Sequence, residues 1–338
     1  MRSYLLIHKR ALRRNLERIY SIQKKRIIAV LKANAYGIGL NVVAPIIANH
    51  PFVDMIAVAC PTEGANLREM GIKKPILVLG GAFEDELKLF KNYSLTPVIS
   101  HIEHIRALKH FSGNVHIKFD TGMGRLGFLD LPDTKNLKIV GAMTHLCCPQ
   151  DIKETQSQIE RFKNLIKGLR NLKFIHIQSS GSLTYRVKFA THVRVGISIF
   201  GEKPFEGFKL SFQRALELRA SIISIKEVPE GYGVSYSKTF ITPRKTKLGV
   251  VAIGYADGLS RQLSNRGFLY LNSQKLPIVG NITMDLTIMD LTNVDAKVGD
   301  YVEVVGPNQS FSELAKIANT IPYELMTSLS FRIKRILV

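Results

Sequence analysis

Eight short apolar segments recur along the first 195 residues, and this repetition restricts the fold more than any other feature of the sequence. Each is four to six residues long and rich in Val and Ile, as is typical of parallel strands buried on both faces. Between several of them, apolar residues recur at helical spacing, as at 12, 16 and 19 and again from 152 to 169. The alternation predicts an α/β fold: a (β/α)8 (TIM-like) barrel, which the count of eight favours, or an open doubly wound sheet. The segments are 27–31, 55–59, 76–79, 97–100, 115–119, 139–144, 174–177 and 192–195.

The pattern changes after Leu216. Six β-type segments follow, separated by turns rich in Gly and Pro, and helical periodicity is nearly absent until residues 312–319. A chain of 338 residues is also too long for one ordinary core. We therefore predict a barrel domain at residues 1–216 and a mostly β domain at 217–338. The β-type segments are 218–225, 247–253, 268–271, 277–279, 287–289 and 301–305.

The formal net charge of +20 raises the alternative of a nucleic-acid-binding protein. However, the cations are spread along the chain, and the densest run, 24–26, adjoins a predicted helix, where a solvated face is usual. The chain has no Trp, and no basic run is interleaved with aromatic residues. We expect no nucleic-acid partner, since a small anionic cofactor or substrate needs only a few of these cations.

The three cysteines, Cys60, Cys147 and Cys148, form neither a zinc-binding spacing nor a disulfide framework. No apolar run approaches the roughly 18 residues of a membrane helix. The N-terminus lacks the apolar stretch and cleavage site of a signal peptide. We expect a cytoplasmic protein with no metal ion and no membrane contact.

Lys32 directly follows the first apolar segment. Burying an ammonium group is costly unless it is paired or neutral, so a lysine at this point is unusual. Barrel enzymes carry their chemistry at the carboxyl ends of their strands, and a neutral amine there suits a Schiff base. Taken alone, Lys32 is equally consistent with a lysine whose ammonium group reaches solvent.

The nine residues 29–37, Ala-Val-Leu-Lys-Ala-Asn-Ala-Tyr-Gly, closely resemble the cofactor signature of alanine racemases. Matching motifs continue in the same order through the second domain at 233–236, 253–258 and 277–280. The resemblance implies a barrel followed by a β domain, and pyridoxal 5'-phosphate bound to Lys32. It implies interconversion of L-alanine and D-alanine, which supplies D-alanine for cell-wall peptidoglycan. It also implies that Tyr36 hydrogen-bonds the cofactor phosphate, whereas Ile38 departs from the histidine usual after Tyr-Gly.

Residues 118–127 begin at the end of the fifth strand segment and contain a G-x-G-x-x-G pattern. A dinucleotide site would need a helix directly after this pattern, but Pro132 follows without helical periodicity. The resemblance implies a different use, with Arg125 near the substrate carboxylate and the ring hydroxyl of the cofactor. The planar, permanently charged guanidinium suits such a site. Lys118 matches a position that is carbamylated in many relatives, where the carbamate orients the arginine.

Several small or polar residues are expected to hold the phosphate group. Ser180 follows the seventh strand segment, where a hydroxyl and free backbone N–H groups suit a phosphate. The resemblance implies backbone N–H donors at Gly196 and Ile197 and a hydroxyl donor at Tyr323. Ser179 departs from the asparagine that is usual before this serine.

Arg194 faces the pyridine nitrogen of the cofactor, according to the same resemblance. Because arginine remains cationic, the ring nitrogen should stay unprotonated, which disfavours transamination. The resemblance places His145 against the cofactor ring and His176 beside Arg194. Judged singly, each histidine could instead be an ordinary hydrogen-bonded core residue.

Racemisation requires a base on each side of the α-carbon. Lys32 would serve one face, and Tyr255 the other if nearby cations favour its phenolate. In the family this tyrosine reaches the active site of the partner subunit, so the resemblance implies a head-to-tail homodimer with composite sites. It also implies that the backbone N–H of Met284 binds the substrate carboxylate, supported by Asp285, whereas Thr283 departs from a frequent cysteine.

Three alternatives remain beside an alanine racemase. A barrel-type amino-acid decarboxylase shares the lysine motif. However, such enzymes place a glutamate at the pyridine nitrogen, where this chain has Arg194, and use a cysteine from the β domain, where this chain has Tyr255. A non-catalytic cofactor-carrying barrel typically lacks a β domain. A racemase of serine or another small amino acid stays open, because one methylene in a pocket discriminates by only about 1–3 kcal/mol.

Overall fold

The computed structural model describes residues 1–134 and 136–338. The chain divides into two compact units. One, here called the barrel unit, comprises Arg13–Ile199 and Phe208–Ser211. The other, here called the β unit, comprises Met1–Leu12, Phe200–Gly207 and Phe212–Val338. The division predicted from the sequence, into domains at 1–216 and 217–338, remains a prediction.

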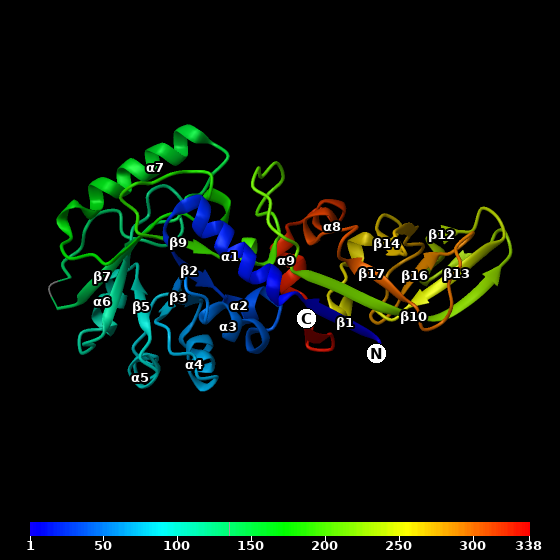
Figure 1. The fold of residues 1–338 in the computed structure, drawn as a ribbon, viewed down its shortest axis with the longest axis horizontal. Helices are drawn as coiled ribbons and strands as arrows, with labels where there is room; N and C mark the ends of the chain where they lie inside the picture. The colour runs from blue at the N-terminus through cyan, green and yellow to red at the C-terminus, as the bar shows by residue number, and fades with distance from the viewer. Residues whose placement is uncertain (135) are drawn as a thin grey trace. The chain divides into compact units, whose positions relative to one another are not determined.

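The barrel unit contains a closed barrel of eight parallel strands, as the apolar segments predicted (Figure 1). The first strand lies between the second and the last, with Ile27 opposite both Val53 and Val193, and this pairing closes the sheet. The strands are short and apolar because each buries both of its faces. They are β2 (Arg26–Val30), β3 (Val53–Val58), β4 (Ile76–Val78), β5 (Thr96–Ile99), β6 (Asn114–Lys118), β7 (Lys138–Met143), β8 (Phe174–His176) and β9 (His192–Val195).

Helices follow most of these strands and lie around them (Figure 1). In α7 (Ile152–Leu165), the Asp151 side chain accepts a hydrogen bond from the Glu154 N–H, which caps the first turn. The apolar stripe of this helix buries Phe162 completely, at 6.1 Å from the ring of Phe119. The other helices are α1 (Lys9–Gln23), which crosses the boundary between the units, α2 (Lys32–Tyr36), α3 (Leu40–Ala48), α4 (Pro61–Glu69), α5 (Leu87–Asn92) and α6 (Ile102–Ala107).

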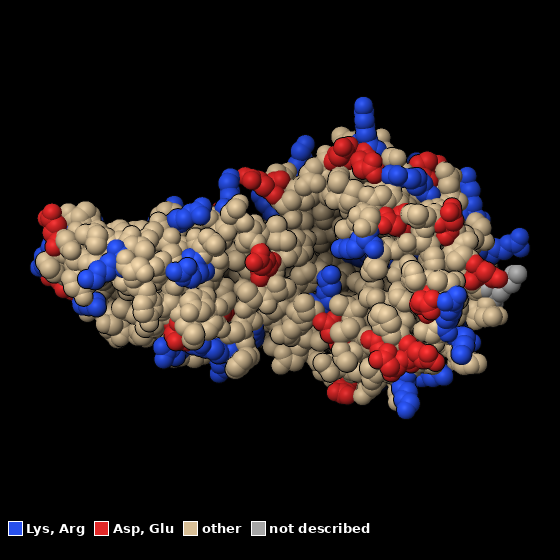
Figure 2. Space-filling model, turned by 180° about the vertical axis from the view of Figure 1, so that it is seen from behind, with Lys and Arg blue, Asp and Glu red and all other residues tan. Residues whose placement is uncertain are grey.

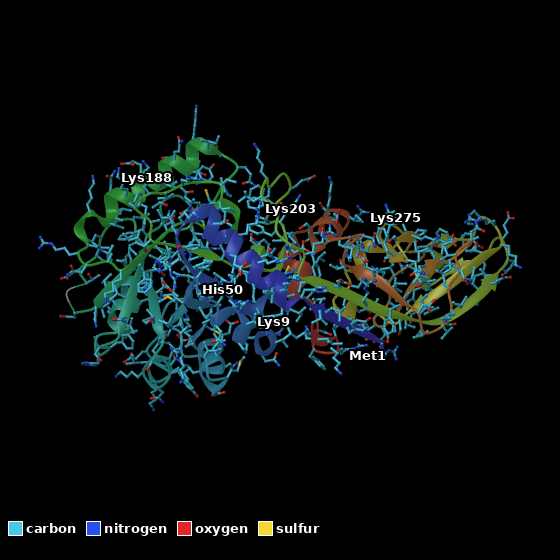
Figure 3. All side chains as sticks on the ribbon, viewed as in Figure 1. Met1, Lys9, His50, Lys188, Lys203 and Lys275 are labelled. Carbon is cyan, nitrogen blue, oxygen red and sulfur yellow. The ribbon has the colours of Figure 1, made fainter. Side chains whose placement is uncertain are left out.

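His50, labelled in Figure 3, is a buried histidine of the barrel unit outside the predicted site residues. Its ring is buried 5.5 Å from the ring of Phe52, and its Nε2 atom lies 3.9 Å from Glu17 Oε1. Burial lowers its pKa, and a neutral imidazole is therefore favoured.

The β unit is built on an eight-stranded sheet. Its central strand, β10 (Leu216–Val228), pairs antiparallel with β1 (Ser3–Ile7), β13 (Thr246–Val251) and β17 (Tyr301–Val305). The N-terminal strand β1 was not anticipated in this sheet; its alternating burial shows that only one face packs on the core. Of the predicted segments, 277–279 is displaced, since β15 (Gln274–Pro277) ends there and only an isolated bridge follows. The remaining sheet strands are β14 (Phe268–Leu271), β16 (Thr287–Asp290) and β18 (Lys334–Leu337).

The remaining elements of the β unit are small. A two-stranded sheet pairs β11 (Gly233–Val234) with β12 (Phe240–Ile241), and two helices follow, α8 (Phe311–Ile317) and α9 (Pro322–Thr327). Within the described residues, no helix has the length and apolar character needed to cross a membrane. On the face shown in Figure 2, Lys and Arg lie among Asp, Glu and uncharged residues and form no continuous basic surface.

Replacing Phe162 by alanine is expected to destabilise the barrel unit by about 3–5 kcal/mol, because it leaves a cavity beneath α7. Denaturant-induced unfolding followed by circular dichroism measures the effect. Ile152→Ala on the same helix is the control, because that side chain is 62% exposed. Equal effects of the two substitutions would contradict the packing of α7 described above.

Candidate active site

The carboxyl ends of the barrel strands bring together a group of polar side chains distant in sequence. Lys32 follows β2, Lys118 ends β6, His145 follows β7, and His176 ends β8. The charges of Lys32, Lys118, Arg125 and Arg194 all act on His145, which places these groups within electrostatic reach of one another. This is the end of a barrel at which enzymes of this architecture carry their chemistry.

Lys32 opens a left-handed turn. Ala33, Asn34, Ala35 and Tyr36 all have φ between 52° and 59°. Each non-glycine residue in this conformation costs roughly 1–2 kcal/mol, so the surrounding contacts must hold the turn in place. At its far end, the Asn34 Oδ1 atom accepts a hydrogen bond of 2.7 Å from the Leu40 N–H.

Positive charge dominates this end of the barrel. Partial burial and the Arg125 guanidinium lower the pKa of Lys32, although its side chain is exposed. Burial, Arg125 and Arg194 together lower the pKa of Lys118 to about 8. The arrangement therefore favours neutral amines and an anionic ligand.

The loop that carries Arg125 is held by one carboxylate. Asp120 accepts hydrogen bonds from the N–H groups of Gly122, Met123 and Arg125 at 2.8–2.9 Å. The loop returns to the barrel through a bridge between Phe119 and Phe128, and no helix follows it directly. The helix that a dinucleotide site requires is therefore missing from residues 128–134.

Arg194 is buried, and both terminal nitrogens of its guanidinium donate hydrogen bonds. It donates to His176 Nδ1 at 3.0 Å, to His145 Nδ1 at 3.1 Å and to the Thr144 carbonyl at 2.7 Å. Burial and Arg125 lower its pKa to about 9, which leaves it cationic at neutral pH.

This arginine fixes the proton positions of His145 and His176 directly, and that of His116 through His176. Because a guanidinium only donates, His176 Nδ1 must accept, so the His176 proton is on Nε2. That N–H donates to His116 Nδ1 at 2.9 Å, so the His116 proton is also on Nε2. The described part of the chain offers this N–H no partner. Sequence analysis did not single out His116, although a histidine inside an apolar strand was the available signal.

A second cluster in the barrel unit presents hydrogen-bond donors around Gly196. The Ser180 hydroxyl accepts from the Gly196 N–H at 3.2 Å, and Ile197 begins a short 3-10 helix. A Cβ atom on Gly196 would lie 2.1 Å from the Tyr36 hydroxyl oxygen, so only glycine fits under this tyrosine. Hydroxyl groups and a helix start suit a phosphate group. Ser179 closes the neighbouring turn, where its N–H donates to Ser182 Oγ at 2.8 Å.

The predicted residues of the β unit form their own cluster. The Tyr255 N–H donates to the Thr283 carbonyl at 3.0 Å, and the next N–H donates to the Met284 carbonyl at 2.9 Å. Arg332, which sequence analysis missed, links this turn to the neighbouring loop, since it lies 3.2 Å from Asp257 and 2.8 Å from Asp285.

Tyr255 and Met284 are exposed, at 45% and 53%, and are therefore available to a ligand or partner. Tyr323, at the start of α9, is different. Burial raises its pKa to about 12, so its phenol stays protonated and can donate a hydrogen bond.

Comparison with known proteins gives a consistent result over the whole chain. Residues 7–204 match the family described as alanine racemase, N-terminal domain, and residues 215–337 match alanine racemase, C-terminal domain. The chain is 52% identical over 324 residues to the alanine racemase of Aquifex pyrophilus, covering 96% of this chain and 95% of that one. It is 50% identical over 337 residues to the alanine racemase of Aquifex aeolicus strain VF5, covering 100% and 99%. Alanine racemase from Bartonella henselae, solved with covalently bound pyridoxal phosphate, has a TM-score of 0.91 and 28% identity, with both chains fully covered.

The barrel unit is expected to lose stability in acid, because it buries histidines in their neutral form. Burial lowers the pKa of His116 from 6.5 to about 3. Between these two pH values, this histidine is protonated in the unfolded chain but not in the folded chain. Stability should therefore fall as pH drops from 6.5 towards 3, by up to about 1.4 kcal/mol per pH unit for this histidine.

Denaturant unfolding at several pH values measures this dependence. His116→Gln keeps an acceptor for His176 but does not titrate, so its stability should depend less steeply on pH. The exposed His110→Gln is the matched control. An unchanged slope in His116→Gln would show that His116 is not held neutral.

Proposed function

Because this chain belongs to the alanine racemase family, we propose that it interconverts L-alanine and D-alanine with pyridoxal 5'-phosphate as its cofactor. The observation that carries the proposal is the family match over both domains, combined with a lysine at the carboxyl end of β2. The Bartonella henselae relative carries the same cofactor covalently. The D-alanine would supply cell-wall peptidoglycan, and a cytoplasmic location remains a prediction.

The donors in the barrel unit fit this cofactor. Hydroxyl and backbone N–H groups around Gly196 match a phosphate monoester, and the cationic end of the barrel matches its negative charge. When bound, the cofactor withdraws electrons from the amino-acid substrate and so acidifies its Cα–H bond. The residues proposed to hold it are Lys32 for the carbonyl carbon, Tyr36, Ser180, Gly196, Ile197 and Tyr323 for the phosphate, Arg194 for the pyridine nitrogen and His145 for the ring.

Arg194 would control which reaction occurs. Its guanidinium is cationic at neutral pH and only donates hydrogen bonds, so beside the ring nitrogen it would disfavour protonation of that nitrogen. Hydrogen bonds to His176 Nδ1 and to the Thr144 carbonyl hold it in place. An unprotonated ring withdraws electron density less strongly, which favours return of the proton to the α-carbon over transamination.

Lys32 and Tyr255 would move the proton. Burial and Arg125 lower the pKa of Lys32, which favours the neutral amine that can accept a proton at Nζ. Tyr255 would accept or return the proton at its hydroxyl on the opposite face. Arg125 and the Met284 N–H would bind the substrate carboxylate, with Lys118 and Asp285 in supporting positions.

We further propose a head-to-tail homodimer in which Tyr255 and Met284 serve the partner's barrel. Both side chains are exposed, and Tyr236, whose carbonyl bonds Asn281 on the adjoining loop, is 74% exposed. Exposed Tyr and Met side chains gathered on one surface are typical of an interface core.

The proposed activity predicts that the purified, cofactor-loaded chain converts L-alanine to D-alanine, as measured by a chiral assay. Lys32→Ala should be inactive, because it removes both the cofactor attachment and one base. Amine release with carbon dioxide would instead identify a decarboxylase. Racemisation of serine without alanine would correct the substrate.

Tyr255→Phe should reduce racemisation about 10²–10⁴-fold in both directions, because each direction uses both bases. Exchange of the α-proton in deuterated water separates the two roles. D-alanine should still exchange through Lys32 with retained configuration, whereas L-alanine should exchange much more slowly. Tyr232→Phe, an exposed tyrosine of the same unit, is the control. Equal exchange of both enantiomers would remove Tyr255 from the mechanism.

The composite site predicts complementation between two inactive variants. Mixing Lys32→Ala with Tyr255→Phe and allowing subunits to exchange should restore about one quarter of the native sites, since half the dimers then carry one intact site. Activity after mixing, measured against each variant alone, tests this. An unrestored mixture whose subunits have exchanged would contradict composite sites.

A further inference from the structure

One carboxylate joins the ends of two neighbouring barrel strands beside Lys32. Glu63, in the first turn of α4, accepts a hydrogen bond from the Ala33 N–H at 2.5 Å through Oε1. Through Oε2 it accepts from the Ala59 N–H at 2.7 Å. Ala33 directly follows Lys32, and Ala59 directly follows β3. Glu63 therefore binds the Lys32 turn to the adjacent strand.

These contacts are not those that this position of a helix ordinarily makes. Glu63 is the third residue after the N-cap Cys60, where a glutamate usually accepts from the N-cap N–H of its own helix. Here the carboxylate instead reaches one residue further back, to Ala59, and across to Ala33. The Glu63 carboxylate is thus directed towards the lysine turn.

The Ala33 N–H belongs to the peptide group that contains the Lys32 carbonyl. Holding this N–H fixes the orientation of that peptide plane and hence the direction in which the Lys32 side chain leaves the backbone. It also secures the start of the left-handed turn, just as Asn34 secures its end.

Charge supports the same conclusion. Among the described residues, the groups that interact electrostatically with Lys32 include Arg125, Lys118, His145 and Glu63. Burial and Arg125 lower the pKa of Lys32, and Glu63 acts in the opposite direction.

We propose that Glu63 is a positioning residue for Lys32, which aims the amine by holding the Ala33 N–H and offsets the surrounding cations with its negative charge. The proposal rests on the proposed function only for the catalytic use of Lys32. Glutamate suits this task because it offers two acceptor oxygens and enough reach. An aspartate side chain is too short, and a glutamine side chain has only one acceptor oxygen.

Two variants separate position from charge. Glu63→Asp keeps the charge but shortens the side chain, whereas Glu63→Gln keeps the length but loses the charge and one acceptor. Glu69→Gln is the control, because Glu69 lies on the same helix and binds the Tyr93 hydroxyl at 2.8 Å. Thermal unfolding of all four proteins shows whether the variants remain folded.

The first measurement uses the full chain without cofactor. Competitive acetylation of Lys32 as a function of pH, followed by mass spectrometry, gives the pH at which its amine becomes reactive. Glu63→Gln should shift this midpoint to lower pH, because the anion that raises the Lys32 pKa is lost. Glu63→Asp and Glu69→Gln should lie closer to the wild-type midpoint.

The second measurement uses the cofactor-loaded enzyme. Both Glu63 variants should lower kcat by up to about 100-fold with little change in KM, because a misdirected amine slows proton transfer more than substrate binding. Wild-type kcat in both variants, or an unchanged Lys32 midpoint in Glu63→Gln, would overturn the proposal. So would losses that merely follow the unfolded fraction. A wild-type chain that racemises no amino acid would overturn the proposed function instead, while the acetylation result would still decide the role of Glu63.

Discussion

Crowding of positive charge at one end of a closed barrel is the constraint on which the rest of the site depends. Barrel closure forces the carboxyl ends of all eight strands to the same side, so Lys32, Lys118 and Arg194 converge although the sequence separates them by up to 162 residues. Mutual repulsion and burial make this arrangement unfavourable unless an anion binds or the amines are neutral. The crowded positive charge therefore costs stability, but it also favours an anionic ligand and a neutral amine.

The buried network behind Arg194 shows how a single permanent charge organises its neighbours. Because the guanidinium only donates, it determines the proton positions of His176 and His116 in turn. The resulting chain of neutral imidazoles holds the arginine by hydrogen bonds that do not neutralise its charge. Reaction specificity in the proposed function depends on that cation staying in place.

Much of the fold could be predicted from the sequence, because strands buried on both faces must be short apolar runs, and all eight barrel strands were found where such runs occur. The N-terminal strand β1 was missed, since a five-residue alternation is too short to reveal its partner, β10, more than 200 residues away. The 277–279 segment was misplaced because the strand that pairs with β14 begins with the polar, exposed residues Gln274 and Lys275, which an apolar pattern does not mark.

The sequence by itself determined the kinds of residue at the candidate site: a lysine after an apolar strand, an arginine within another, and glycine where a tyrosine packs closely. Only the tertiary structure decided how they act on one another. The contacts of Glu63 with Ala33, of His116 with His176 and of Tyr36 with Gly196 join residues 30, 60 and 160 positions apart. No local pattern encodes such pairings, because barrel closure and the register of its strands bring these residues together.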